Sequence, residues 1–181
     1  MPCGTRVETV RKAWLAALAL AGAPLAVAEV TSVNDHGFGV SHSQTTPANA
    51  QDTWAALSGD ISQWWDGAHS WSGNANNLYL DIKPGGCFCE RLPEGGWVEH
   101  LRIVYLAPGQ EIRFRGALGP LMTLGLEGTM TWRLEPVDEG TKISFNYIVS
   151  GHREAGFEGL APAVDNVIGQ QLDGLVLSLA R

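Results

Sequence analysis

The chain has few charged residues, and it lacks the motifs by which proteins bind nucleotides. Asp, Glu, Lys and Arg make up 17% of its 181 residues, and its formal net charge is −7. Nucleic-acid affinity comes largely from Lys and Arg on phosphates, so an acidic chain without a basic run is not expected to bind nucleic acid. The same balance disfavours anionic membrane surfaces. The glycine pairs Gly85-Gly86 and Gly95-Gly96 lack the Lys and Ser/Thr of a phosphate-binding loop.

Long apolar runs are also scarce, and the one near the N-terminus has the layout of a secretory signal peptide. Arg6, Arg11 and Lys12 precede an apolar run from Ala13 to Ala23, and Ala26-Val27-Ala28 is a small-x-small cleavage signal. The run is short for a membrane span of about 20 residues. We therefore predict cleavage rather than anchoring.

Cleavage after Ala28 divides the chain into a signal peptide, residues 1–28, and a single domain, residues 29–181. The removed part carries three basic residues and one acidic residue, so the net charge moves to −9 from −7. The remaining chain is long enough for one domain with its own core. We expect an exported protein, periplasmic or secreted, without stable membrane insertion after cleavage.

Cysteines are few, and Cys3 is removed with the predicted signal peptide. Cys87 and Cys89 remain, and a C-x-C spacing places both side chains on one face of a strand. A disulfide between them would need Cα atoms near the usual upper limit of about 6.8 Å. We therefore expect two buried thiols packed as small apolar groups.

The first part of the domain is predicted to contain a strand followed by two short helices. Residues 30–44 have β-branched residues and no helical period, which indicates one strand. Thr46 is the expected N-cap of the first helix, with Pro47 at its first position. Ser58-Gly59 ends that helix, and Asp60 can cap a second short turn.

The rest of the domain predicts an antiparallel meander followed by a long helix. Apolar and polar residues alternate between Gly- and Pro-rich turns. Strands are expected at residues 78–82, 87–91, 97–106, 112–118, 126–134 and 142–151. Apolar residues then recur at helical spacing from Leu160 to Leu179, and this amphipathic helix must dock on the sheet.

Four motifs, in this order along the chain, resemble a known superfamily. They are Trp64-Trp65, Pro84-Gly85-Gly86-Cys87-Phe88, Leu106-Ala107-Pro108-Gly109 and Gly140-Thr141-Lys142. With this order of elements the chain is similar to the START-like, helix-grip or SRPBCC superfamily, in its branch of heat-shock-protein-90 ATPase activators or of polyketide cyclases. The resemblance implies an α+β helix-grip fold, in which a curved antiparallel sheet of about six or seven strands wraps around the long C-terminal helix. It also implies a hydrophobic cavity between sheet and helix, but no particular reaction.

The segment from residue 61 to 73 is rich in tryptophan and broken by glycine. Each indole ring buries a large apolar area and carries one N–H that needs a partner. We expect one of Trp64 and Trp65 to point into the core and the other elsewhere. In the helix-grip order this segment lies at the cavity entrance, so Trp71 and His69 are expected at its rim.

The residues proposed to bind a ligand come from this segment and from the strands. Glu90 and Arg115 are the best candidates for inward-facing charges, which would fix the polar end of a ligand. Leu172, Leu175 and Leu179 would add apolar wall from the helix. The proposed ligand-binding residues are Trp65, His69, Trp71, Glu90, His100, Arg115, Trp132 and Tyr147.

The main functional hypothesis is an exported domain that holds a hydrophobic, amphipathic or aromatic small molecule, without a cofactor or metal and without an assigned catalytic residue. One alternative is a cyclase or hydrolase with His69 or His100 as acid/base and Glu90 or Arg115 orienting the substrate. Another is an interaction module with a filled interior and an apolar patch around Trp71.

A metal site is a further possibility, although no recognised metal-ligand spacing is found. Its ligands would be drawn from Cys87, Cys89, His69, His100 and Glu99. A turn at residues 92–96 places Cys89 opposite Glu99 in one register and opposite His100 in the other. The cluster can form in only one of them.

Overall fold

The computed structural model describes Met1 and residues 27–181, so the predicted signal sequence up to Ala26, and Cys3 with it, lie outside the described residues. The elements are β1 (Val27–Asn34), β2 (Gly37–Thr46), α1 (Ala50–Ser58), the short 3-10 helices η1 (Ile61–Gln63), η2 (Gly67–His69) and η3 (Ala75–Asn77), β3 (Leu78–Leu80), β4 (Cys87–Arg91), β5 (Trp97–Ala107), β6 (Glu111–Arg115), α2 (Pro120–Thr123), β7 (Glu127–Val137), β8 (Gly140–Ser150) and α3 (Leu160–Leu179).

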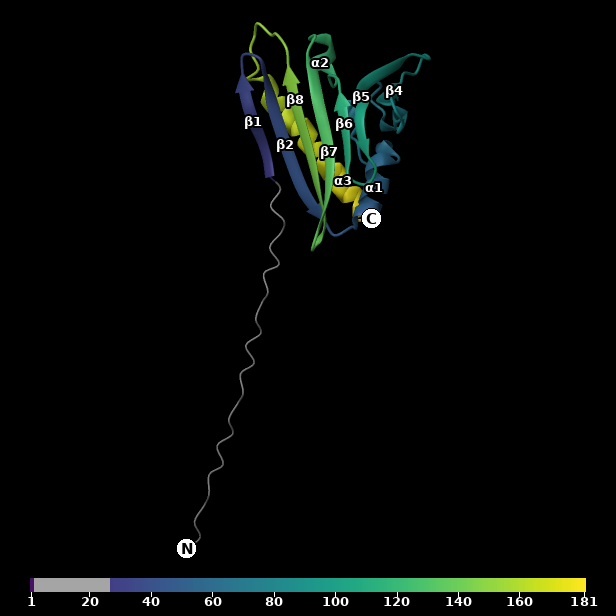
Figure 1. Ribbon diagram of the computed structural model, residues 1–181, viewed down its shortest axis with the longest axis vertical. Helices are drawn as coiled ribbons and strands as arrows, with labels where there is room; N and C mark the ends of the chain where they lie inside the picture. The colour runs from purple at the N-terminus through teal and green to yellow at the C-terminus, as the bar shows by residue number, and fades with distance from the viewer. Residues whose placement is uncertain (2–26) are drawn as a thin grey trace.

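All strands belong to one antiparallel sheet with the order β1-β2-β8-β7-β6-β5-β4-β3. The long helix α3 crosses one face of this sheet, behind β2, β8 and β7 in Figure 1. The sheet has eight strands, because the region expected to be one strand forms two. The predicted α+β helix-grip fold is confirmed.

The single strand predicted over residues 30–44 is wrong, because the chain reverses at Asn34-Asp35-His36-Gly37. Asn34 Oδ1 accepts a hydrogen bond from the His36 amide at 2.8 Å, and Asn34 pairs with Gly37. Gly37 has φ +154°, and a Cβ there would collide with the Val149 carbonyl of β8. Only glycine can therefore open β2 so close to its neighbour.

Two short helices follow β2, as predicted, but the first begins later than expected. Its N-cap is Asn49, whose side chain accepts from the Asp52 amide at 2.9 Å. Thr46 instead pairs with Thr141 at the end of β2, so it cannot cap a helix. Helix α1 ends at Ser58, and Asp60 caps η1 through the Ser62 amide, as expected.

The core is an aromatic cluster between the sheet, η1 and α3. The Trp64 ring lies edge-on to Trp132 at 5.5 Å, and Trp132 stacks on Phe145 at 5.1 Å. Trp65 contacts Phe88 at 4.8 Å. Trp64 and Trp65 are both 5% exposed, so the expectation that one ring would point elsewhere is wrong. The irregular backbone at Trp64, with φ −138° and ψ −22°, lets consecutive rings reach the same core.

Helix α3 has the bounds predicted from its apolar period. Leu172 and Leu175 are fully buried beneath it, and Asp165 bonds to His42 Nε2 of β2 at 2.8 Å. Gly169 allows the helix to lie close to that ring, because a Cβ there would be 2.8 Å from His42 Cε1. In the described part of the chain no helix combines the length and apolarity needed to cross a membrane.

Cys87 and Cys89 form a disulfide, which contradicts the expectation of two thiols. Their Cα atoms are 5.4 Å apart. A regular strand would separate them by about 6.6 Å, two residue steps. The register shifts at this place, because Phe88 pairs with Leu101 while the next residue, Cys89, pairs with Glu99. The sheet is therefore irregular beside the disulfide, and the regular-strand geometry used for the prediction does not apply.

Candidate functional site

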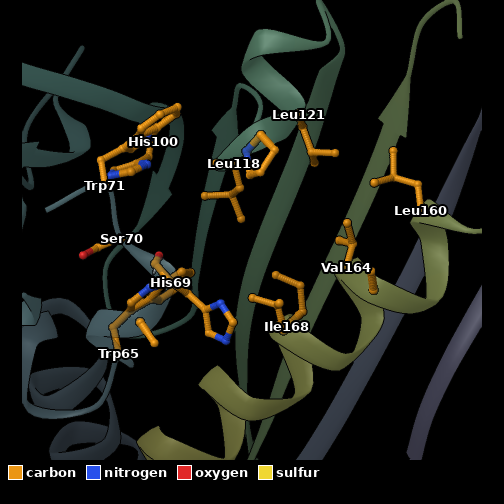
Figure 2. A pocket seen from close by; sticks show the side chains of 15 residues that line it. Trp65, His69, Ser70, Trp71, His100, Leu118, Leu121, Leu160, Val164 and Ile168 are labelled. Atoms are coloured by element: carbon orange, nitrogen blue, oxygen red, sulfur yellow. Dashed lines mark hydrogen bonds between the residues drawn. The ribbon is translucent and has the colours of Figure 1, made fainter. Parts of the chain in front are cut away.

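A pocket of about 440 Å³ opens between the first half of α3, the tryptophan-rich segment and α2. Figure 2 shows Leu160, Val164 and Ile168 of α3 on one side, Trp65, His69, Ser70 and Trp71 on the other, and Leu118 and Leu121 closing a third side. The remaining lining residues are Ala68, His100, Gly119, Pro120, Ala163 and Val167.

The walls of this pocket are mostly apolar, and the helical part comes from the N-terminal half of α3. The predicted wall residues Leu172, Leu175 and Leu179 do not line it. Toward its C-terminal end α3 lies against η1, since a Cβ on Gly174 would collide with the Trp64 carbonyl. The C-terminal half of α3 is thus packed against η1, and the pocket lies beside its N-terminal half, between α3, the tryptophan-rich segment and α2.

The polar end of the pocket is a buried histidine–glutamate pair. His100 Nε2 and Glu90 Oε2 are 2.9 Å apart, and the two residues are 4% and 0% exposed. Glu90 also accepts from the backbone amides of Trp71 at 2.9 Å and Ser72 at 2.6 Å. The carboxylate therefore ties the tryptophan-rich segment to β4 and orients the His100 ring.

A β-bulge places His100 at the pocket. The pairs Phe88–Leu101 and Cys89–Glu99 leave His100 as the extra residue of β5. His100 and Leu101 are both buried, although consecutive residues of a regular strand face opposite sides. Bulges re-aim side chains in this manner, and here the imidazole reaches both Glu90 and the pocket.

The protonation states of the pair follow from burial and hydrogen bonding. Burial alone would raise the pKa of Glu90, but the hydrogen bonds from Ser72, Trp71 and His100 outweigh it and hold the pKa below its usual value. Burial lowers the pKa of His100, and the neighbouring Glu90 offsets this only in part. Near neutral pH the pair is therefore an ionised carboxylate with a neutral imidazole.

The tryptophan-rich segment closes the pocket beside this pair. His69 Nε2 lies 3.0 Å from Gln170 Oε1 of α3, and the His69 carbonyl accepts from Trp65 Nε1 at 3.2 Å. Trp71 is 48% exposed at the edge of the pocket. Trp65, His69, Trp71 and His100 all line the pocket, and Glu90 lies directly behind His100.

A comparison with protein families agrees with the helix-grip fold of the chain. Residues 38–180 match the model of a family described as polyketide cyclase/dehydrase and lipid transport. The chain belongs to this polyketide cyclase/dehydrase family. A comparison with curated proteins gives no match.

Solved structures share the fold of this family member at low sequence identity. An uncharacterized protein from Rhizobium leguminosarum is 20% identical over 87% of this chain and 99% of its own, with a TM-score of 0.59. CalU16 from Micromonospora echinospora is 14% identical over 88% and 87%, with a TM-score of 0.57. A Mesorhizobium loti protein is 19% identical over 79% and 97%, with a TM-score of 0.56.

Four predicted ligand-binding residues of this polyketide cyclase/dehydrase family member lie outside the pocket lining: Glu90, which is fully buried behind His100, and Arg115, Trp132 and Tyr147. Arg115 points outward and pairs with Glu127 at 3.4 Å, so its expected inward orientation is wrong. Trp132 is fully buried in the core. The Tyr147 hydroxyl donates to the Gly116 carbonyl at 3.1 Å and accepts from the Leu118 amide at 3.0 Å. Burial raises the pKa of Tyr147, which supports the wall from behind as a neutral phenol.

The alternative metal cluster does not fit the observed bonds. Cys87 and Cys89 are joined to each other, and Cys89 pairs with Glu99 rather than with His100. Within the residues the structure describes, no group of three or more His, Cys, Asp or Glu converges as metal ligands would. The interaction-module alternative required a filled interior, whereas the structure contains a pocket of about 440 Å³.

The sequence reasoning missed the wall made by residues 118–121 and by the start of α3. No helix is predicted between the strands expected at residues 112–118 and 126–134, although Pro120 opens the short helix α2 and Leu121 is buried. Proline after glycine is a helix-start signal that could have indicated α2. No sequence signal showed that α2 faces Val164.

Proposed function

We propose that this protein is an exported domain that holds a small, mainly apolar molecule between α3 and the tryptophan-rich segment. The observation that carries the proposal is a pocket of about 440 Å³ whose apolar walls end at the buried His100–Glu90 pair. Sites for small molecules are typically of this size, apolar, and supplied with a few placed polar groups. The family description, polyketide cyclase/dehydrase and lipid transport, supports a ligand of this kind.

Export is supported by two independent features of the chain. The sequence before Glu29 has the charges, apolar run and cleavage signal of a secretory leader. The Cys87–Cys89 disulfide is typical of an oxidising compartment. Cleavage after Ala28 would leave Glu29 to Asn34 of β1 paired with β2. N-terminal sequencing of protein secreted by an expressing bacterium tests this, and an intact N-terminus on the purified protein would contradict it.

Binding is tested by native mass spectrometry of gently purified protein, followed by calorimetric titration with a panel of aromatic and lipid-like compounds. We expect a co-purified molecule or saturable binding. Val164→Trp, which fills the pocket from α3, should abolish it. Asn166→Trp adds the same ring on the exposed side of the same helix and should leave binding intact. Absence of both a co-purified molecule and saturable binding would refute the proposal.

A second candidate function is proton transfer, and the His100–Glu90 pair specifically favours it. An imidazole oriented by a carboxylate and facing an apolar pocket is the arrangement of a general base. In this role Nδ1 takes a proton from a bound ligand while Glu90 stabilises the imidazolium. The test is deuterium exchange at the acidic C–H of an aryl β-diketone in D₂O. Protein-accelerated exchange that disappears in His100→Gln supports it, and equal acceleration by both proteins rules it out.

A further inference from the structure

We propose that the pocket selects neutral ligands whose polar group donates a hydrogen bond, such as an alcohol, a phenol or an N–H, and that His100 Nδ1 accepts it. This inference rests on the proposed binding function and specifies the ligand class. The pocket should then prefer hydroxylated molecules to carboxylates and phosphates, although its apolar walls alone would not distinguish between these ligands.

The proton of the neutral His100 ring is fixed on Nε2. That nitrogen faces Glu90 Oε2 at 2.9 Å. The same oxygen accepts from the Trp71 amide, and the other carboxylate oxygen accepts from the Ser72 amide. A carboxylate that receives two amide N–H groups is held in its ionised, acceptor-only form. Nε2 must then carry the hydrogen, and Nδ1 keeps its lone pair.

The lone pair of Nδ1 faces the pocket. In the described part of the chain no hydrogen bond to Nδ1 is found, and no buried side-chain nitrogen or oxygen there lacks a partner. Nδ1 is therefore not sealed inside the protein. The open space that His100 contacts is the pocket, which it lines together with Trp71 and Leu118.

The hydrogen-bond donors of the tryptophan-rich segment that could hold an anion are already used. The backbone amides of Ala68, His69, Ser70 and Trp71 each donate within the protein. The Ser70 hydroxyl donates to the Gly67 carbonyl at 2.8 Å.

The charges around the pocket also disfavour an anion. No Lys or Arg is among the lining residues, and the ionised Glu90 lies behind His100. A bound anion would thus meet an acceptor and a negative charge, without a cation to pair with.

The test compares three ligands that share one ring system and one substitution site: naphthol, its methyl ether and naphthoate. Calorimetric titration of the purified protein should give naphthol the tightest binding, about 3- to 10-fold tighter than the ether, as one net hydrogen bond contributes. Naphthoate should be weakest. Equal affinities, or naphthoate binding best, would overturn the inference while the proposed binding function stands. Absence of saturable binding by all three would overturn the inference and count against the binding function as well.

A pair of variants assigns the selectivity to one atom. His100→Phe keeps an aromatic ring beside Phe88 and removes the acceptor, so naphthol and the ether should bind with the same affinity. His42→Phe is the matched control, since His42 is also a buried histidine bonded to a carboxylate but does not line the pocket. His42→Phe should keep the wild-type ratio of naphthol affinity to ether affinity. If folded His100→Phe still bound naphthol more tightly than the ether, the assignment of the selectivity to His100 Nδ1 would be overturned. The ranking in the unaltered protein tests the ligand class even if this variant does not fold.

Discussion

The part of the chain that the structure describes contains two histidine–carboxylate pairs that look alike and have different surroundings. His100 bonds to Glu90 at 2.9 Å, and His42 bonds to Asp165 at 2.8 Å, each through Nε2. The Glu90 side chain is 0% exposed and that of Asp165 is 22% exposed. In the first pair His100 lines the pocket, whereas the second pair joins β2 to α3 and neither of its residues is in the lining.

The difference lies in what else each carboxylate holds. Glu90 also accepts from the amides of Trp71 and Ser72, so it organises the segment that closes the pocket. Asp165 has His42 as its side-chain partner and helps to anchor a helix whose apolar face already buries Leu172 and Leu175. The Glu90 pair should therefore be needed for both the site and stability, and the Asp165 pair mainly for docking α3.

The largest expected effect comes from removing the two carboxylates in turn. Glu90→Ala leaves two amides and the His100 ring without their acceptor in a buried place, which should lower the free energy of unfolding by about 3 kcal/mol or more. Asp165→Ala, at a more accessible site, should lower it by about 1 kcal/mol. Urea unfolding measures both. Equal losses would show that the two pairs are energetically equivalent, contrary to this comparison.

The next effect concerns the close approach of α3 to the second pair. Gly169→Ala places a Cβ 2.8 Å from His42 Cε1 and 3.1 Å from its Nδ1, and the ring is held by Asp165. Overpacking of this kind should lower the free energy of unfolding by about 1–2 kcal/mol. Ligand binding should change little, because Gly169 does not line the pocket. Asn166→Ala on the exposed side of α3 is the control, and thermal unfolding should show no loss for it. If Gly169→Ala were as stable as the unaltered protein, the His42 ring would have to move freely.

A pH titration should separate the pairs with a smaller effect. Burial holds the pKa of His100 below its usual 6.5, so the unfolded chain binds a proton at this residue before the folded protein does. Stability from this group is therefore complete above about pH 6.5 and falls as the pH drops below it. Glu90, whose pKa is also lowered, adds a second loss below about pH 4.5.

The pH effect is measured by urea unfolding between pH 8 and pH 5. His100→Gln should weaken the dependence just below pH 6.5, whereas His42→Gln keeps the His100 contribution. If the stability of both variants depended on pH in the same way, the assignment of this dependence to His100 would be wrong. Binding of a hydroxylated ligand should weaken in the same direction, because a protonated Nδ1 no longer accepts a hydrogen bond.

Much of the fold was predictable because its signals are local. The apolar period predicts α3 from Leu160 to Leu179, and turn residues on either side predict β4 at Cys87–Arg91. The hairpin at residues 34–37 was missed because its turn lacks the usual Asn-Gly pair and depends on a glycine fitted against β8. The Cys87–Cys89 disulfide was missed because irregular sheet geometry brings their Cα atoms closer than a regular strand would.

The site was only partly predictable, because its key feature is one extra residue in β5. Composition and order placed His69 and Trp71 near the entrance, but only the bulge brings His100 to Glu90 and to the pocket. The predicted helical wall lies in the wrong half of α3, since periodicity shows which face of the helix is apolar but not which part of that face lines the pocket. Arg115 was misassigned because the direction of alternation in β6 was not fixed.

The smallest effect is expected at that misassigned residue. In β6 the buried apolar residues are Ile112 and Phe114, so the side chain of Arg115 points to the opposite face of the sheet. It pairs there with Glu127 at 3.4 Å, with both side chains more than half exposed. Such a pair contributes about 0–0.5 kcal/mol, so Arg115→Ala should leave stability and ligand affinity nearly unchanged. Thermal unfolding and calorimetric titration measure the two. A clear loss of affinity for an anionic ligand in this variant would mean that Arg115 reaches a ligand, and the pocket would then offer it a cation after all.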